Sequence, residues 1–280
     1  MKSPFRFHSL TSLFAAAFAF SGMTQSNAQS PTPAPATTAP APKPAPKPQS
    51  EPAPVGIKLP EKAEAGTIRT LIVGGGSSHD FNKWFNEADS ATLKAAGGFV
   101  TAYSPSPSEV VEQLKNADVL VLSTNHPAFD NPEFHKALEA FAAAGKGIIL
   151  LHPGTWYAWG KWADYNKTFV GGGAKSHDAL GPFTVNVKAP EHPIMKGVPA
   201  TFEVKDELYQ VNLDPAAAKA EVLLETSVSK KTGKAHPSVW TVANDKAKIV
   251  CIALGHDGDV HNLQAYKTLL TNAVHWAAGK

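Results

Sequence analysis

Residues 68–76 read IRTLIVGGG, an apolar run rich in β-branched side chains that ends in three glycines. Such a run predicts a buried strand followed by a loop. Similar runs lie at residues 99–103, 118–122 and 147–151, and the segments between them have the 3.6-residue spacing of helices. Strands that are apolar along their whole length are typical of a parallel sheet covered on both faces. We therefore predict a doubly wound α/β sheet with its first four strands in the order 2-1-3-4.

The second half of the chain has a different pattern. Short apolar runs joined by brief turns predict an antiparallel β meander or an extension of the sheet, with strands at 183–187, 202–211, 221–226 and 238–242. Residues 248–254 then predict a return to the core sheet, and residues 263–278 predict a closing helix. The fold class is therefore α/β, mainly parallel, with an added antiparallel meander.

The N-terminus has the pattern of a secretory signal over residues 1–28. Lys2 and Arg6 precede an apolar run at 10–20, and the small residues Ser26 and Ala28 suit a cleavage site. A membrane anchor is the alternative, but the apolar run is shorter than the ~20 residues that span a bilayer. We expect cleavage, a periplasmic or secreted protein, and no membrane span afterwards.

Residues 29–65 form a proline-rich stretch that holds eleven of the chain's 23 prolines. Proline fixes φ and lacks an amide hydrogen, so the stretch predicts an extended spacer rather than a helix or sheet. It is either a tether for the domain or a leader without a partner. We expect one folded domain at residues 66–280.

Charge and cysteine content exclude some functions. The formal charge is +2, and the folded part is nearly balanced, so it has no basic excess that would indicate nucleic acid binding. Cys251 is the only cysteine, and it lies within an apolar run. We interpret it as a small core residue rather than a nucleophile.

Histidines follow several of the predicted strands. His79 comes after the first strand, Asn125 and His126 after the third, His152 after the fourth, and His256 after the late core strand. Because ligands bind beyond the carboxyl ends of parallel strands, we expect these side chains to face one polar crevice. Each histidine alone would be interpreted as an ordinary surface or hydrogen-bonded residue.

Aromatic residues gather just after His152. Trp156, Tyr157, Trp159 and Trp162 could stack on sugar rings or could form a hydrophobic core under their loop. The sequence leaves both readings open. The glycine-rich stretch after the first strand matches neither the dinucleotide fingerprint nor the P-loop, so a nucleotide site is weakly supported.

Six ordered motifs resemble the ThuA-like family, named for trehalose utilisation. They are LHPGTWY at 151–157, VGGG followed by His177, EHPI at 191–194, DELY at 206–209, HPSVW at 236–240 and LGHD at 254–257. The resemblance covers about residues 69–279. It implies a flavodoxin-like sheet of the class I glutamine amidotransferase-like superfamily and a link to sugar catabolism.

The chain departs from true amidotransferases at one place. Those enzymes carry a nucleophilic cysteine in a tight turn after a central strand. Here the corresponding turn is His152-Pro153-Gly154, and Cys251 lies elsewhere. We therefore predict that the protein is not a glutamine amidotransferase.

The favoured hypothesis is a hydrolase or lyase that acts on a sugar or keto-sugar glycoside. His79, His152 and His256 would be catalytic with Glu207, and His79 and His256 are the candidate ligands of a divalent metal such as zinc. Asp206 and Glu207 point to opposite faces if they lie on a strand, so only one should enter the site. The candidate substrate-binding residues are Asn125, His126, Trp156, Tyr157, His177, Asp206 and Tyr209.

Two alternatives stay open. One is a non-catalytic carbohydrate-binding module, which the aromatic cluster and the proline-rich stretch would suit. The other is a structural protein of a secreted complex. Convergence of the three histidines favours the enzyme, and dispersed histidines beside an aromatic groove favour the module. We expect a small-molecule carbohydrate as the partner, and the sequence leaves the exact substrate, the metal and the oligomeric state open.

Overall fold

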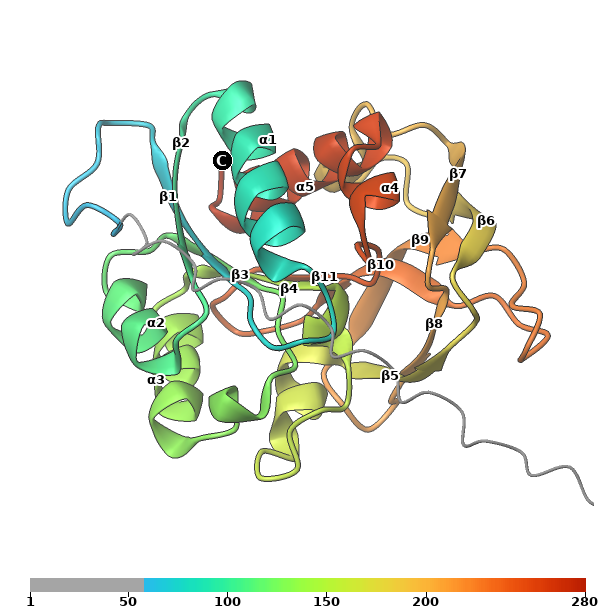
Figure 1. The fold of residues 1–280 in the computed structure, drawn as a ribbon, viewed down its shortest axis with the longest axis horizontal. Coiled ribbons are helices and arrows are strands. Elements are labelled where there is room, and N and C mark those ends of the chain that lie inside the picture. Colours follow the sequence, from blue (N-terminus) through green and yellow to red (C-terminus); the bar gives the residue numbers. More distant parts are fainter. Residues whose placement is uncertain (1–57) are drawn as a thin grey trace, which may run out of the picture. The chain divides into compact units, whose positions relative to one another are not determined.

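The fold is shown in Figure 1, a computed structural model that describes residues 58–280. The predicted signal peptide and residues 29–57 of the predicted spacer lie outside the described residues. Within residues 58–280, no helix is long and apolar enough to cross a membrane.

One nine-stranded sheet organises the domain, in the order β2-β1-β3-β4-β11-β10-β9-β6-β7. The first five strands of this order are parallel, which confirms the predicted 2-1-3-4 arrangement and completes a flavodoxin-type order. Their bounds are Phe99–Ser104 (β2), Ile68–Val73 (β1), Val119–Leu122 (β3), Gly147–Leu151 (β4) and Ile249–Ile252 (β11).

The other four strands extend the sheet in antiparallel fashion, so the late strands form a sheet extension rather than a consecutive meander. They are Pro237–Val242 (β10), Ala220–Thr226 (β9), Gly181–Val187 (β6) and Thr201–Asp206 (β7). A separate two-stranded sheet pairs Gly172–His177 (β5) with Tyr209–Leu213 (β8). The architecture is thus α/β with a parallel centre and an antiparallel extension.

Helices cover both faces of the parallel strands (Figure 1). One face carries Asp89–Ala96 (α1), the short Gly258–His261 (α4) and Gln264–Ala277 (α5), and the other carries Pro107–Leu114 (α2) and Pro132–Ala143 (α3). The parallel strands are almost entirely buried, because each face packs against its own apolar cluster. This two-sided burial explains why these strands are apolar along their whole length.

Two predicted elements differ from the structure. The strand predicted at 202–211 is two strands, β7 and β8, which belong to different sheets and are separated at Glu207 and Leu208. The helix predicted at 81–96 begins with a π-helical segment, Asn82–Ala88, before it continues as α1. Both departures from regular secondary structure lie next to residues of the candidate site. The break between β7 and β8 contains Glu207, and the π-helical segment follows His79. Irregular segments of this kind are frequent at functional sites.

The folded part begins before Gly66, the start expected from the sequence. Leu59 is 3% exposed and packs in one of the two core clusters. Its backbone N–H donates to Gln113 Oε1 at 3.1 Å, and the guanidinium of Arg69 donates to the Glu61 carbonyl at 2.7 Å. The last residues of the predicted spacer, from 58 onward, are therefore part of the domain.

Candidate functional site

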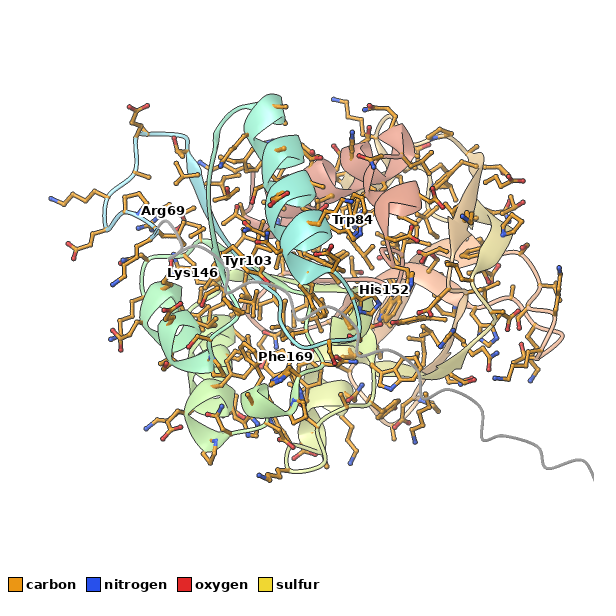
Figure 2. The ribbon with its side chains drawn as sticks, in the orientation of Figure 1. Arg69, Trp84, Tyr103, Lys146, His152 and Phe169 are labelled. Carbon is orange, nitrogen blue, oxygen red and sulfur yellow. The ribbon has the colours of Figure 1, made fainter. Side chains whose placement is uncertain are left out.

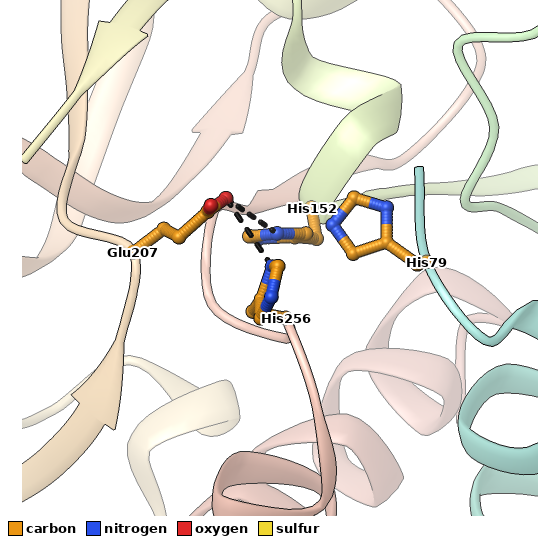
Figure 3. Close-up of side chains that lie close together, drawn as sticks. All are labelled: His79, His152, Glu207 and His256. Atoms are coloured by element: carbon orange, nitrogen blue, oxygen red, sulfur yellow. Dashed lines mark ion pairs between the residues drawn. The ribbon is translucent and has the colours of Figure 1, made fainter. Parts of the chain in front are cut away.

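Four side chains from four parts of the chain converge at the carboxyl ends of the parallel strands. His79 follows β1, His152 follows β4, His256 follows β11, and Glu207 occupies the break between β7 and β8. Each offers one ligand atom, and these atoms all lie within 4.8 Å of one another. Figure 3 shows Glu207 reaching His152 and His256 from one side, with His79 on the other side of these two imidazoles. The structure thus brings together all four residues predicted as catalytic.

The distances within this cluster are short. Glu207 Oε2 lies 3.3 Å from His256 Nδ1 and 3.8 Å from His152 Nε2 (Figure 3). The ring of His79 lies 4.8 Å from that of His152 and 4.8 Å from that of His256, between centroids. The cluster is therefore a single site rather than three separate histidines.

Hydrogen bonds on the outer side of two imidazoles determine which nitrogen faces the centre. His152 Nδ1 lies 2.7 Å from the Ala253 carbonyl, and a carbonyl only accepts, so Nδ1 carries the hydrogen. His79 Nδ1 lies 2.9 Å from the hydroxyl of Ser78. The inner nitrogen of His152 therefore bears a lone pair, whereas the Ser78 hydroxyl can donate to or accept from His79 Nδ1 and orients the His79 ring without fixing its tautomer.

The inner nitrogens lack partners. His79 Nε2, His152 Nε2 and His256 Nδ1 are buried, and none has a hydrogen-bond partner within residues 58–280. The contact of His256 with Glu207 is close but is not aligned along a ring N–H bond. A buried polar atom without a partner is costly, so three of them around one point indicate that the site receives a ligand.

The protonation states of three of the four residues, His79, His152 and Glu207, suit a cation. Burial, reinforced by neighbouring His256, lowers the pKa of His79 to about 4, and burial also lowers the pKa of His152 well below its usual value. Burial alone would raise the pKa of Glu207, but contact with His256 lowers it overall. Contact with Glu207 raises the pKa of His256. Two neutral imidazoles beside an ionised carboxylate are competent metal ligands at neutral pH.

A tight turn places His152. It is the one non-glycine residue within residues 58–280 with a positive φ, +44°, and it opens a short 3-10 turn directly after β4. Gly154, two residues on, approaches β3 so closely that a Cβ there would collide with the Leu122 carbonyl. Backbone strain of this kind is concentrated at functional sites, because it must be held by the surrounding structure.

Asp206 holds the backbone of two of the four residues. It is fully buried, and its Oδ1 accepts the backbone N–H of Glu207 at 2.8 Å and of His256 at 3.1 Å. Burial raises the pKa of Asp206 to about 7, while these backbone donors oppose the rise. Asp206 therefore supports the backbone of the site, which corrects the prediction that it binds substrate. Of the two acidic residues, only Glu207 enters the site.

The remaining predicted substrate-binding residues divide into two groups. Tyr209 is 5% exposed and stacks on His152, with ring centroids 4.3 Å apart, so it packs behind the site and does not face a substrate. His177 Nδ1 lies 3.6 Å from Glu207 Oε1, and the ring of Trp156 lies 6.0 Å from that of His177. His177 and Trp156 are half-buried at the edge of the cluster.

Asn125 and His126 flank the opposite edge. The Ser78 hydroxyl that contacts His79 lies 3.5 Å from Asn125 Oδ1, which links Asn125 to the cluster. His126 accepts the backbone N–H of Ala128 through Nδ1 at 3.1 Å, so its Nε2 carries the hydrogen. Both side chains are half-buried and available to a ligand.

The aromatic residues after His152 have separate roles. Trp159 and Trp162 are 5% and 8% exposed and pack with Tyr165 in the core, so for them the core interpretation is correct. Tyr157 is 39% exposed and its ring lies under Lys175 Nζ at 4.5 Å. Trp156 is the aromatic side chain that contacts residues of the site.

Some supporting residues could not be anticipated from the sequence. Ser78, the Ala253 carbonyl and the buried residues Asp89 and His261 support the cluster only through tertiary contacts. Asp89 and His261 lie outside the motifs of the sequence, although His261 follows His256 by five positions, whereas Ser78 and Ala253 adjoin His79 and the LGHD motif. Cys251, by contrast, is fully buried in β11, and burial raises the pKa of its thiol well above the usual value, which confirms its core role.

The residues present fit a divalent metal ion. The inner atoms are three imidazole nitrogens and one carboxylate oxygen, a donor set that zinc and related transition metals accept. Two of the imidazoles also have the outer hydrogen bonds that normally orient metal-binding histidines. The sequence predicted His79 and His256 as metal ligands, and the geometry adds His152 and Glu207 to the candidate ligands.

Solved structures of related folds agree with this architecture. A ThuA-like protein from Parabacteroides merdae ATCC 43184 is 22% identical, with a TM-score of 0.67, over 76% of this chain and 91% of that one. A ThuA-like protein from Bacteroides uniformis ATCC 8492 is 25% identical, with a TM-score of 0.62, over 77% of this chain and 93% of that one. A cytoplasmic protein from Salmonella typhimurium LT2 is 16% identical, with a TM-score of 0.54, over 75% and 99% of the two chains.

No curated protein matches this sequence significantly. The model of one protein family, ThuA, described as trehalose utilisation, matches residues 69–277. That match spans the parallel sheet except Ile68, its antiparallel extension and all four residues of the cluster. The chain therefore belongs to the ThuA family.

Proposed function

We propose that this protein is a hydrolase or lyase that acts on a sugar or keto-sugar glycoside at a metal site formed by His79, His152, His256 and Glu207. The observation that carries the proposal is the set of three buried imidazole nitrogens, unpartnered within the described residues, that face one carboxylate. On the basis of the predicted signal peptide, we expect this activity in the periplasm or outside the cell.

A bound divalent metal would polarise an oxygen of the substrate or lower the pKa of a bound water. The chain's own residues would do the rest. Glu207 lies between the cluster and His177, whose Nδ1 is 3.6 Å from Glu207 Oε1. His177 Nδ1 donates to the Asp178 carbonyl at 2.8 Å, so His177 flanks Glu207 at the half-buried edge without exchanging a proton with it. The carboxylate of Glu207 is the group that would exchange a proton with the substrate.

The family and the site's edge both favour a carbohydrate. The family is described by trehalose utilisation. Trp156 lies beside His177 at the half-buried edge, where its ring could pack against the apolar face of a sugar. Asn125 and His126 supply hydrogen-bonding groups on the other edge, which suits a ligand rich in hydroxyl groups.

A non-catalytic carbohydrate-binding module has less support. That function predicts dispersed histidines beside an aromatic groove, whereas the histidines converge and the neighbouring tryptophans Trp159 and Trp162 are core residues. A groove of about 670 Å³ between α1 and α5 is lined mainly by alanine, threonine and asparagine and has no aromatic platform.

The proposal is tested by metal analysis together with turnover. We expect about one divalent metal per chain in the purified protein, and metal-dependent cleavage of a glucoside disaccharide or its keto derivative, followed by product chromatography. His79→Ala should abolish both, while the matched control His275→Ala, which removes an imidazole packed on Phe99, should keep both.

Two results would contradict the proposal. Absence of bound metal in protein prepared with added zinc would remove its central element. Sugar-induced thermal stabilisation of metal-loaded protein, without turnover of any tested glycoside, would favour the binding module.

A further inference from the structure

The loop that carries His256 is held by side chains from two directions. On one side, Asp206 Oδ2 accepts the Gly255 N–H at 2.8 Å and Asp206 Oδ1 accepts the His256 N–H at 3.1 Å. On the other side, His261 Nε2 lies 3.1 Å from the Gly255 carbonyl. The peptide unit that joins Gly255 to His256 is thus held on both sides. Its C=O contacts His261, and its N–H donates to Asp206.

His261 is itself held by a buried carboxylate. Its Nδ1 lies 2.7 Å from Asp89 Oδ1, and both side chains are essentially inaccessible to solvent. Tyr266 donates its hydroxyl to the other oxygen, Asp89 Oδ2, at 3.3 Å. The ring of Phe85 packs edge-on against His261, with centroids 4.8 Å apart. The imidazole therefore has no room to turn away from the Gly255 carbonyl.

The hydrogen positions follow from these contacts. A carbonyl only accepts, so His261 Nε2 carries a hydrogen that it donates to Gly255. A second hydrogen lies between Nδ1 and Asp89 Oδ1, because neither atom could approach the other to 2.7 Å without one. Asp89 therefore fixes the orientation in which His261 can donate.

We propose that His261 and Asp89 are positioning residues that hold the His256 loop in the geometry required by the metal site. The inference rests on the proposed function, since His256 is one of its four ligands. Neither residue touches the cluster's inner atoms. The Asp89–His261 pair acts through the Gly255 carbonyl, one residue before His256.

The conformation of Gly255 supports this role. Its φ is +132°, and a Cβ there would lie 3.4 Å from the Cβ of His152 and 3.5 Å from His261 Nε2. The loop therefore passes between a ligand and the positioning histidine with little spare space. A displacement of His261 would move the loop directly against His152.

Stability alone does not account for the buried pair. A buried ion pair gives little net stability compared with apolar residues of similar volume, because both groups lose their hydration. The surroundings of His261, which include Trp84, Phe85 and Tyr266, would accept an aromatic ring in its place. Hydrogen-bonding partners behind metal ligands typically contribute about 10–100-fold to metal affinity.

Titration of metal-free protein with Co²⁺ tests the inference, since bound Co²⁺ reports its geometry through its visible spectrum. His261→Phe keeps an aromatic ring and removes the donor, and it should raise the Kd for Co²⁺ by about 10–100-fold and change the visible bands. His261→Gln can still donate to Gly255 and should restore most of the affinity. The matched control His135→Phe removes a histidine paired with Asp130, and it should bind Co²⁺ like the wild type.

Equal Co²⁺ affinity and an unchanged spectrum in His261→Phe would overturn the inference. If His261→Phe does not fold, His261→Gln tests the inference instead. A folded Gln variant should bind Co²⁺ nearly as tightly as the wild type. A tenfold weaker Kd for that variant would contradict the role of the donated hydrogen bond.

Amide hydrogen exchange separates this inference from the metal site, because it needs no metal. The Gly255 and His256 amides should exchange slowly in the wild type and faster in His261→Phe, while Leu150 in β4 keeps its protection. A wild type that shows this pattern but binds no Co²⁺ contradicts the metal site alone. Unchanged exchange in the variant contradicts the role of the Asp89–His261 pair.

Discussion

The two ends of the parallel sheet each carry a cluster of charged or titratable residues, but they differ in how their atoms are partnered. At the amino end, Asp118 accepts Arg69 Nε and Nη2 at 3.0 and 2.9 Å and Lys146 Nζ at 2.9 Å. At the carboxyl end, three buried imidazole nitrogens have no hydrogen-bond partner within residues 58–280. Arg69 and Lys146 lie far from His152 in Figure 2.

This difference separates a structural cluster from a functional one. Each oxygen of Asp118 has two donors, and these contacts outweigh the opposing effect of burial and lower its pKa well below the usual value. The amino-end cluster is complete as it stands. The carboxyl-end cluster is buried and incomplete, which is stable only if a ligand supplies the missing interactions.

Loss of one imidazole at the carboxyl end should have the largest effect. His152→Asn places an amide where Nδ1 was, which keeps a donor for the Ala253 carbonyl, and asparagine tolerates the φ of +44°. The inner nitrogen is lost, so we expect Zn²⁺ affinity to fall by at least about 100-fold. Isothermal titration with Zn²⁺ measures this, with circular dichroism as the check on folding. Wild-type affinity in this variant would break the distinction between the two ends.

A packing change near the amino end should cost stability and leave the site intact. Leu59→Ala removes a buried side chain from the core cluster, and we expect a loss of about 2–3 kcal/mol in the free energy of unfolding. Urea denaturation measures the loss, and Lys58→Ala, at an exposed position, is the control. An unchanged midpoint would mean that the domain starts later than residue 58. Zn²⁺ affinity should be unchanged.

The Asp118 cluster should show a modest, pH-dependent contribution. Asp118→Asn should lower stability at pH 7 by about 1 kcal/mol, because the carboxylate is partly exposed and screened by solvent. The folded pKa lies below the unfolded value of about 3.9, so the wild type's advantage exists above that pH and shrinks as the pH falls below about 4. Thermal unfolding of both proteins from pH 3 to 7 measures the gap. A gap that widens in acid would have the wrong sign for this account.

The smallest effect is expected at Cys251. Cys251→Ala removes one buried sulfur from β11, on the amino side of the site, and should cost on the order of 1 kcal/mol. Zn²⁺ affinity and turnover should not change, because the thiol faces the Phe169 carbonyl within the core. Inactivation by thiol reagents that spares the Ala variant would show that Cys251 takes part in function.

The sequence was sufficient for the parallel sheet because its signal is local. Apolar runs such as 147–151 identify the strands, and the positions of His79, His152 and His256 after them indicate the edge of the sheet at which the histidines meet. Glu207 was predicted from the acidic pair at 206 and 207, but strand alternation does not explain its position, because Glu207 lies in the break between β7 and β8.

The remaining features depend on contacts between distant residues. The run at 202–211 is apolar enough to continue as one strand, and only tertiary packing breaks it at Glu207. Asp206 looks like a surface residue in sequence, yet it becomes the buried acceptor of three backbone N–H groups. Asp89 lies 172 positions from its partner His261, so no local pattern could pair them.

An anomalous difference map from crystals grown with zinc tests the central claim most directly. The account predicts one strong peak per chain, about 2.0–2.1 Å from the inner nitrogens of the three histidines and within bonding distance of a Glu207 oxygen. His275 and the Asp118 cluster should show none. Crystals that diffract well with zinc present and show no peak among His79, His152, His256 and Glu207 would contradict the account.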